Sequence, residues 1–166
     1  LVPRFASDDG QLFMSFQAFA VKSGNRRIMV DTCVGNDKHR QHPLFDHLRT
    51  SFLDDLAVAG FPPESIDTVL CTHLHLDHVG WNTKLVDGRW VPTFPNARYL
   101  FSRKEWDFIH GLVNVAGAEV DHLPDSLQPV LTDLFETITL FEHKAESASA
   151  VKRPDGHWDV TLEVKA

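Results

Sequence analysis

Four side chains of the types that commonly bind metal ions stand within one short segment: His73, His75, Asp77 and His78. In an extended segment, residues two apart face the same way, so His73 and His75 can present their imidazoles to one ion. Asp77 and His78 follow where the chain must turn, and they can reach a second ion nearby. Imidazole and carboxylate suit zinc and also iron or manganese. We therefore predict a centre for one or two metal ions, with zinc as the default and iron or manganese left open.

The spacing of this group is specific. In a chain with 10 histidines, the same pattern would arise by chance on the order of a few times per thousand chains. A short apolar run from Ile66 to Thr72 precedes the group, and Gly80 follows it. A run of this length is typical of a buried strand. The histidines are therefore predicted at the C-terminal end of a strand.

Other predicted elements must hold that strand in place. Alternating apolar and polar residues and turn residues predict further strands at residues 14–22, 27–31, 85–91 (a hairpin), 98–101, 137–141, 148–152 and 157–164. Apolar residues three and four apart predict helices at residues 45–59 and 126–135. A third helix at residues 102–110 is predicted to begin with a capping box of Ser102 and Glu105. Mixed strands and helices without a linker indicate one α/β or α+β layered domain over residues 1–166.

Composition narrows the kinds of partner. The formal net charge of −7 repels polyanions, so we expect a small-molecule substrate and no nucleic acid. No apolar run approaches the roughly 20 residues that span a bilayer, and no leader opens the chain, so we expect no membrane partner and a cytoplasmic protein. Cys33 and Cys71 each end an apolar run and are interpreted as small buried side chains.

Residues 71–80 resemble the signature of the metallo-β-lactamase superfamily. Residues 28–35 are similar to that superfamily's strand ending in an aspartate, and residues 81–83 and 94–99 resemble its lactonase-like hydrolase branch. The resemblance implies an αββα sandwich. It also implies that two metal ions activate a bridging hydroxide for attack on an ester, lactone, thioester or amide carbonyl. In that scheme Asp77 is a ligand and then a catalytic proton carrier, and Asp31 braces the ligand loop without binding metal.

The sequence departs from the family pattern after residue 135. The third histidine ligand lacks its usual glycine-rich surroundings, and we favour His143 over His157 because it follows a predicted strand. The bridging aspartate and the last histidine are not found, so only the N-terminal part of the sandwich is expected to be complete. A partner chain or a homo-oligomer would then cover the exposed edge. We expect such a chain to bind metal weakly and to hydrolyse lactones or esters slowly.

Alternatives to the hydrolase stay open at this stage. The chain can be a non-catalytic or weakly metal-binding homologue that needs a partner chain, or a relative that uses non-haem iron. The superfamily's nuclease branch is disfavoured by the acidic charge. Trp81 and Tyr99 can line a substrate pocket, although aromatic residues near strand ends are more often part of the core. The remaining histidines considered lack ligand spacing and are expected to be surface or helix residues: His39, His42, His47, His110 and His122.

Overall fold

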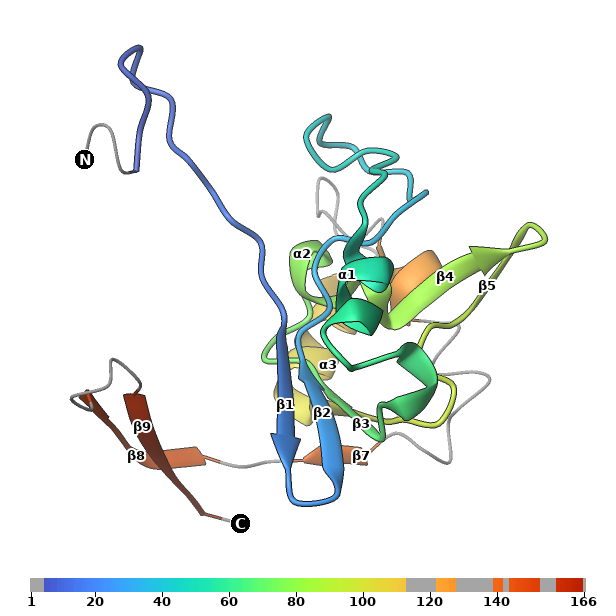
Figure 1. Cartoon of the computed structure of the whole chain (residues 1–166). Helices are drawn as coiled ribbons and strands as arrows, with labels where there is room; N and C mark the ends of the chain where they lie inside the picture. The colour runs from blue at the N-terminus through green and yellow to red at the C-terminus, as the bar shows by residue number, and fades with distance from the viewer. Residues whose placement is uncertain (1–4, 113–121, 128–138, 142–143, 153–157, 166) are drawn as a thin grey trace.

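The computed structural model describes residues 5–112, 122–127, 139–141, 144–152 and 158–165. One sheet organises this part of the chain (Figure 1). Its strands, in spatial order, are β1 (Phe19–Ser23), β2 (Arg26–Val30), β3 (Thr68–Leu70), β6 (Arg98–Ser102) and β7 (Thr139–Phe141). β1 and β2 form an antiparallel hairpin, whereas β2, β3, β6 and β7 run parallel to one another. Parallel neighbours end at one edge of a sheet, so the loops that follow β2 and β3 meet there.

Two hairpins lie outside this sheet. β4 (Thr83–Val86) pairs with β5 (Arg89–Pro92), and β8 (Lys144–Lys152) pairs with β9 (Trp158–Lys165). The β4–β5 turn has φ values of +49° at Asp87 and +76° at Gly88, as a two-residue type I′ turn requires. The hairpins predicted from alternation and turn residues are thus confirmed in these regions.

The helices agree with the sequence prediction at residues 102–110, to within one residue, and are shorter than predicted at residues 45–59. They are α1 (Phe52–Val58), α2 (Leu76–Val79), α3 (Arg103–Gly111), the 3₁₀ turns Pro63–Ser65 and Gly80–Asn82, and a π-helical turn at Leu123–Leu127. The helix predicted over residues 45–59 begins only at Phe52. Asn36 Nδ2 donates a hydrogen bond to the Thr50 carbonyl, and Thr50 N donates one to Asn36 Oδ1, both at 2.9 Å. These two bonds keep the segment before Phe52 in a loop. Most of the helix predicted at residues 126–135 lies outside the described residues.

The core lies against one face of the sheet. Met29, Val69 and Tyr99 are paired neighbours on adjacent strands, and each is at most 1% exposed. Leu56 of α1 and Ile109 of α3 belong to the same buried cluster. Such a layer of helices on a mixed sheet confirms the predicted α+β layered fold.

The other face of the sheet is covered less completely. Val30, Leu70 and Leu100 form a row across β2, β3 and β6, and each is half-buried. Before β1, residues 5–18 run away from the sheet as an extended arm (Figure 1). Of the helices in the described part of the chain, none has the length and apolar character needed to cross a lipid bilayer.

Candidate metal centre

The loop after β3 alternates between core and surface. Leu74 is fully buried, while His73 is half-buried and His75 is exposed. Burying Leu74 turns the residue on either side of it outward, as expected for an extended segment. The rings of His73 and His75 consequently meet edge to face with centroids 4.6 Å apart. The two imidazoles thus lie on the same side of the loop.

The chain turns immediately after His75. His75 has an extended backbone (ψ 156°) and is the N-cap of α2, whose first turn carries Asp77 and His78. This turn brings the His78 ring back to 3.9 Å from that of His73, centroid to centroid. His78 Nε2 also lies 3.4 Å from Asp77 Oδ2. The structure therefore gathers the motif's side chains around one short turn.

Asp31 holds this turn from the end of β2. Its Oδ1 accepts a hydrogen bond from the Thr72 backbone at 2.7 Å, and its Oδ2 lies 2.9 Å from His78 Nδ1. Asp31 is 6% exposed and has a φ of +59°, a conformation that non-glycine residues adopt at some energetic cost. A carboxylate on Nδ1 fixes the tautomer that leaves Nε2 free to bind a metal. These are the contacts that a bracing role requires.

Backbone hydrogen bonds join the same two loops. Thr32 N donates to the His78 carbonyl at 2.7 Å, and Gly80 N donates to the Cys33 carbonyl at 2.7 Å. Trp81 N donates to the Thr32 carbonyl at 2.9 Å. The backbones can approach this closely because Gly80 has no side chain: a Cβ there would overlap the Val34 carbonyl. The turn is therefore fixed by main-chain contacts as well as by Asp31.

Two further residues support the turn and were not singled out for it from the sequence. Glu105 of α3 accepts a hydrogen bond from Leu74 N at 3.3 Å, so it does not form the predicted capping box with Ser102, which makes no side-chain cap bond. His122 is 1% exposed, with Nε2 2.8 Å from the Leu74 carbonyl. The expectation that His122 is a surface or helix residue is thus wrong, because the core closes over it. Neither contact has a local sequence signal, since each joins segments over 30 residues apart.

The donor set fits a divalent metal ion. Burial, followed by the charges of His78 and His75, lowers the pKa of His73, which favours the neutral imidazole that binds metals. Among the described residues, however, the group of three His, Cys, Asp or Glu side chains whose ligand atoms all lie within 4.8 Å of one another is His39, Asp46 and His47. The motif side chains would therefore have to draw closer together around an ion.

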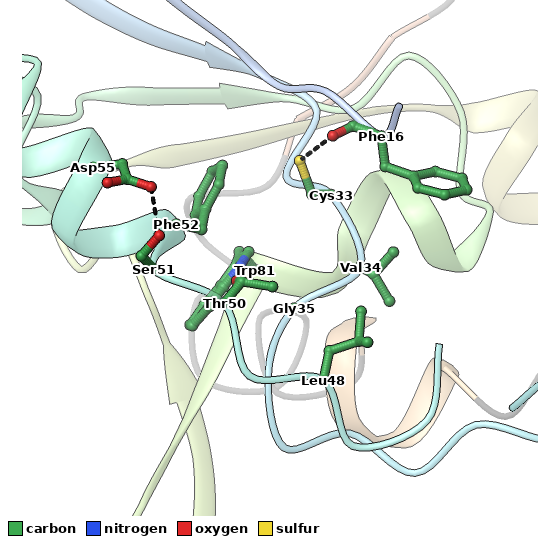
Figure 2. Close-up of a pocket in the computed structure, with 10 residues that line it drawn as sticks. All are labelled: Phe16, Cys33, Val34, Gly35, Leu48, Thr50, Ser51, Phe52, Asp55 and Trp81. Atoms are coloured by element: carbon green, nitrogen blue, oxygen red, sulfur yellow. Dashed lines mark hydrogen bonds between the residues drawn. The ribbon is translucent and has the colours of Figure 1, made fainter. Parts of the chain in front are cut away.

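An apolar cavity of about 340 Å³ is lined by residues of the loop after β2 and by Trp81, which follows the motif in sequence (Figure 2). Its walls include Phe16, Leu48, Phe52 and Trp81, and Phe52 stacks on Trp81 with ring centroids 5.8 Å apart. Tyr99, in contrast, is fully buried, and its hydroxyl donates to the Asn82 carbonyl at 3.1 Å. Trp81 thus lies in the cavity wall and Tyr99 in the core.

Cys33 connects the cavity to the metal-ligand turn. It lines the cavity, and its thiol contacts the Phe16 carbonyl at 3.6 Å. Burial, together with the negative charges of Asp31 and Asp77, raises the pKa of Cys33 to about 11. The Cys33 carbonyl also accepts the hydrogen bond from Gly80 N at the end of the motif turn. Cys33 therefore links the cavity wall to the backbone of the turn that carries the motif.

The remaining predicted ligand cannot be placed. His143 and its competitor His157 both lie outside the described residues. His39, His42, His47 and His110 are exposed, as expected.

Known proteins resemble this chain in sequence and in fold. A model of the metallo-β-lactamase superfamily matches residues 17–149. The crystal structure of the hydrolase AbOPH of the β-lactamase superfamily is similar with a TM-score of 0.64 and 24% identity, covering 96% of this chain and 55% of AbOPH. AidC, a dizinc quorum-quenching lactonase solved with a product, has a TM-score of 0.51 and 25% identity, covering 88% of this chain and 51% of AidC.

A curated relative is also similar over a shorter stretch. Ribonuclease TTHA0252 of Thermus thermophilus is 36% identical over 70 residues, which cover 41% of this chain and 13% of the ribonuclease. The chain thus spans about half the length of the two hydrolases and a small part of the ribonuclease.

Proposed function

Because the chain belongs to the metallo-β-lactamase superfamily, we propose that it is part of a metal-dependent hydrolase that opens a small lactone or ester. The observation that carries the proposal is the gathering of the His73, His75 and His78 rings on one turn, which backbone hydrogen bonds join to the loop that lines an apolar cavity. A divalent ion bound there would supply a water molecule that is acidic enough to act as a nucleophile at neutral pH. Zinc is the proposed ion, and AidC, a dizinc lactonase, supports that choice.

Each residue of the proposed site would have its own role, in binding metal, in orienting a ligand or in transferring a proton. His73, His75, Asp77 and His78 would hold metal, and His143 is proposed as a further ligand. Asp31 would keep His78 in the tautomer that leaves Nε2 free, because it contacts Nδ1 at 2.9 Å. Asp77 would also take up and pass on a proton, since a carboxylate beside the reacting group can do both.

The cavity suits the apolar part of a small substrate. Phe52 and Trp81 form a stacked aromatic wall on one side, and Leu48 and Phe16 are aliphatic and aromatic neighbours. Burying an acyl chain or ring there would stabilise the complex by about 25 cal/mol per Å² of apolar surface. The carbonyl to be attacked would then lie toward Cys33, the wall residue whose backbone is hydrogen-bonded to Gly80 at the end of the motif turn.

The test combines metal binding with hydrolysis on the 166-residue chain. Zinc bound per chain would be measured by equilibrium dialysis and elemental analysis, and hydrolysis of N-hexanoyl homoserine lactone and p-nitrophenyl acetate would be followed with and without zinc. We expect His75→Ala to lower both zinc binding and zinc-dependent hydrolysis. His110→Ala, which changes an exposed histidine of α3, is the matched control and should alter neither.

Two outcomes would overturn the proposal. Zinc binding that His75→Ala leaves unchanged would show that the motif does not hold the metal. Zinc binding that depends on His75 without any metal-dependent turnover would indicate a metal-binding, non-catalytic homologue. An iron or manganese optimum would replace zinc by another ion and leave the proposed residues in place.

The similarity to a ribonuclease favours a second candidate, a nuclease. The net charge of −7 argues against it, because nucleic-acid binding draws most of its affinity from cationic side chains. A single-stranded RNA oligonucleotide in the same assay separates the two. Zinc-dependent cleavage of the RNA, with no lactone hydrolysis, would favour the nuclease.

A further inference from the structure

Residues 36–50 form a loop whose two limbs are tied together near its base. Asp37 N donates to the Leu48 carbonyl at 3.1 Å, and His47 N donates to the Lys38 carbonyl at 2.7 Å. The Asn36 side chain bridges to the backbone of Thr50 at 2.9 Å. These bonds close the loop much as a hairpin does, and they fix where its outer part begins and ends.

Buried charges anchor the same loop in the molecule. Arg40 is 1% exposed and makes two hydrogen bonds to the Asp125 carboxylate, at 2.6 and 2.9 Å. Lys38 is fully buried and donates to Thr83 Oγ1 at 2.8 Å. Since both anchors lie within the loop, the side chains next to them are held in a narrow range of positions.

His39, Asp46 and His47 meet on the exposed side of this anchored loop. Asp46 Oδ1 lies 3.0 Å from His39 Nδ1 and 2.9 Å from His47 Nδ1. All three ligand atoms lie within 4.8 Å of one another. In a tetrahedral zinc site with bonds of about 2.0–2.1 Å, adjacent ligand atoms are roughly 3.3 Å apart. The distances from Asp46 Oδ1 to the two histidine nitrogens therefore differ by only a few tenths of an ångström from the ligand–ligand distance of a zinc site.

Without an ion, one carboxylate oxygen of Asp46 has more neighbouring nitrogen atoms than it can accept hydrogen bonds from. Its Oδ1 faces both ring nitrogens and also accepts from Arg40 N at 2.7 Å. A carboxylate oxygen has about two lone pairs, so three N–H donors cannot all bond to it well. A cation in place of the two ring protons would satisfy the same three ligand atoms.

His47, one of these histidines, has an unusual backbone conformation. His47 has a φ of +47°, a left-handed conformation that is uncommon outside glycine, although asparagine, aspartate and histidine adopt it more often than other residues. Such conformations persist where the surrounding structure imposes them. Here the conformation directs the His47 ring to the carboxylate of the residue before it.

From this geometry we propose that His39, Asp46 and His47 form a second divalent-cation site, which prefers zinc and shares no residue with the motif at residues 73–78. The side chains are 77%, 35% and 60% exposed, so water can complete the coordination. The ion would hold the outer loop closed. Leu48 and Thr50, which directly follow the site, line the apolar cavity, so the ion would also stiffen one wall of that cavity.

The test counts zinc ions on the full 166-residue chain after chelator treatment, by equilibrium dialysis against zinc and elemental analysis. In a background carrying His73→Ala and His75→Ala, we expect one zinc per chain to remain. Adding His39→Ala and His47→Ala should remove it. In the natural chain the same pair should lower the bound zinc by one ion. Asp46→Asn, which keeps an oxygen for Arg40 N, should weaken zinc binding at this site at least about tenfold, or about 1.4 kcal/mol.

His42→Ala is the matched control, because His42 is an exposed histidine of the same loop that contacts Phe45 and not Asp46. It should leave the zinc count unchanged. Circular dichroism would show whether each variant is folded. The proposal is overturned if the folded His39→Ala and His47→Ala variant binds as much zinc as its parent chain. It is also overturned if His42→Ala lowers the count equally, because zinc would then be binding to surface histidines in general.

Discussion

Asp31 illustrates how one residue outside the metal-binding motif can decide whether the motif works. Its carboxylate accepts from the Thr72 backbone and contacts His78 Nδ1. An asparagine would keep the first bond through its oxygen, but its NH₂ group would then face Nδ1. That arrangement favours the tautomer with the proton on Nε2, the atom needed for metal. We therefore expect Asp31→Asn to lower zinc affinity at the motif by about 10–100-fold, measured by competition with a chromogenic chelator.

The matched control is Asp67→Asn. Asp67 accepts a hydrogen bond from Arg27 N at 2.7 Å at the far end of β2, so it makes an equivalent bond away from the motif. Its variant should bind zinc as the natural chain does. Equal zinc affinities of the Asp31→Asn and natural chains would show that His78 does not depend on this carboxylate.

Lys38 is a residue whose charge should change the stability of the protein with pH. Burial, against the attraction of Asp125, lowers the pKa of Lys38 from 10.5 to about 7. Between these values the unfolded chain holds a proton that the folded chain has lost, so the free energy of unfolding rises with pH. Lys38→Met should remove this rise. Urea unfolding at several pH values from about 7 to 10.5 should give a steeper increase for the natural chain than for the variant.

Comparing the free energies of unfolding of the natural chain and the Lys38→Met variant at each pH separates the effect of Lys38 from that of other titrating groups. Burial also raises the pKa of Cys33, which opposes the rise in stability at alkaline pH, but that effect is common to both chains. Parallel profiles for the two proteins would contradict a lowered pKa at Lys38.

At the scale of single residues, spacing in the sequence predicted contacts between residues close together in the chain. It did not predict contacts between residues far apart in the chain. His73 and His75 lie on the same side of the loop because alternation is a local property. Glu105 and His122 reach the Leu74 backbone from other parts of the fold, and His39 meets His47 only because the loop between them folds back. No pattern within a few residues records such contacts. The metal-binding roles themselves, and His143, stay predictions.

At the scale of elements, strands were predicted better than helices. The strand predicted at residues 14–22 begins only at Phe19, but it pairs with the strand predicted at residues 27–31, and the Asp87-Gly88 turn also closes a real hairpin. A strand's two faces and a tight turn each leave a local signal. The predicted helix at residues 45–59 was wrong in its first half. Its apolar spacing at Phe45 and Leu48 instead serves contacts with Phe16 and the cavity, so tertiary contacts prevail over the helical pattern.

Gly80 belongs to the junction of two elements, where the turn after α2 crosses the loop after β2. A Cβ on Gly80 would overlap the backbone of Val34 and Gly35. Three backbone hydrogen bonds, donated by Thr32, Gly80 and Trp81, hold the two loops together at this point. Overpacking usually costs about 1–3 kcal/mol, and backbone atoms cannot move aside as side chains do. We expect Gly80→Ala to lower the free energy of unfolding by at least about 3 kcal/mol, measured by urea denaturation.

Gly111→Ala provides the comparison. Gly111 ends α3, and a Cβ there would meet nothing within 4 Å, so alanine should be neutral or slightly stabilising. A Gly80→Ala protein as stable as the Gly111→Ala protein would show that the two loops can move apart without loss.

At the scale of the whole molecule, one buried ion cluster joins three separate segments. Asp125 bonds to Arg40 and lies 3.6 Å from Lys38, and Lys38 contacts β4 and the Trp90 ring. Asp125→Ala would leave the buried Arg40 guanidinium, and the Lys38 amine, facing no carboxylate in this cluster. Removing one partner of a buried ion pair typically costs about 3–5 kcal/mol, and we expect a loss of that size in urea unfolding. Asp107→Ala, at an exposed position of α3, should change stability by less than about 0.5 kcal/mol.

A combined variant tests whether unpaired charge causes the loss of stability expected for Asp125→Ala. Replacing Lys38, Arg40 and Asp125 together by Met, Met and Leu removes the unpaired charges, and buried ion clusters replaced in this way can be as stable as the original. We expect this variant to be more stable than Asp125→Ala. A combined variant that is less stable would mean that the specific hydrogen bonds, and not the balance of charge, hold the segments together.

The 85 positions that separate Arg40 from Asp125 also bear on when the parts of this molecule form. Closing so long a stretch of chain has an entropic cost that a short hairpin such as β1–β2 avoids. During synthesis, residues 73–78 therefore leave the ribosome before the aspartate that anchors the cavity loop has been added. The motif can gather while Lys38 and Arg40 are still hydrated and the wall beside it is unfinished. If the anchor forms late, changes at Asp125 should mainly speed unfolding and leave the folding rate nearly unaltered.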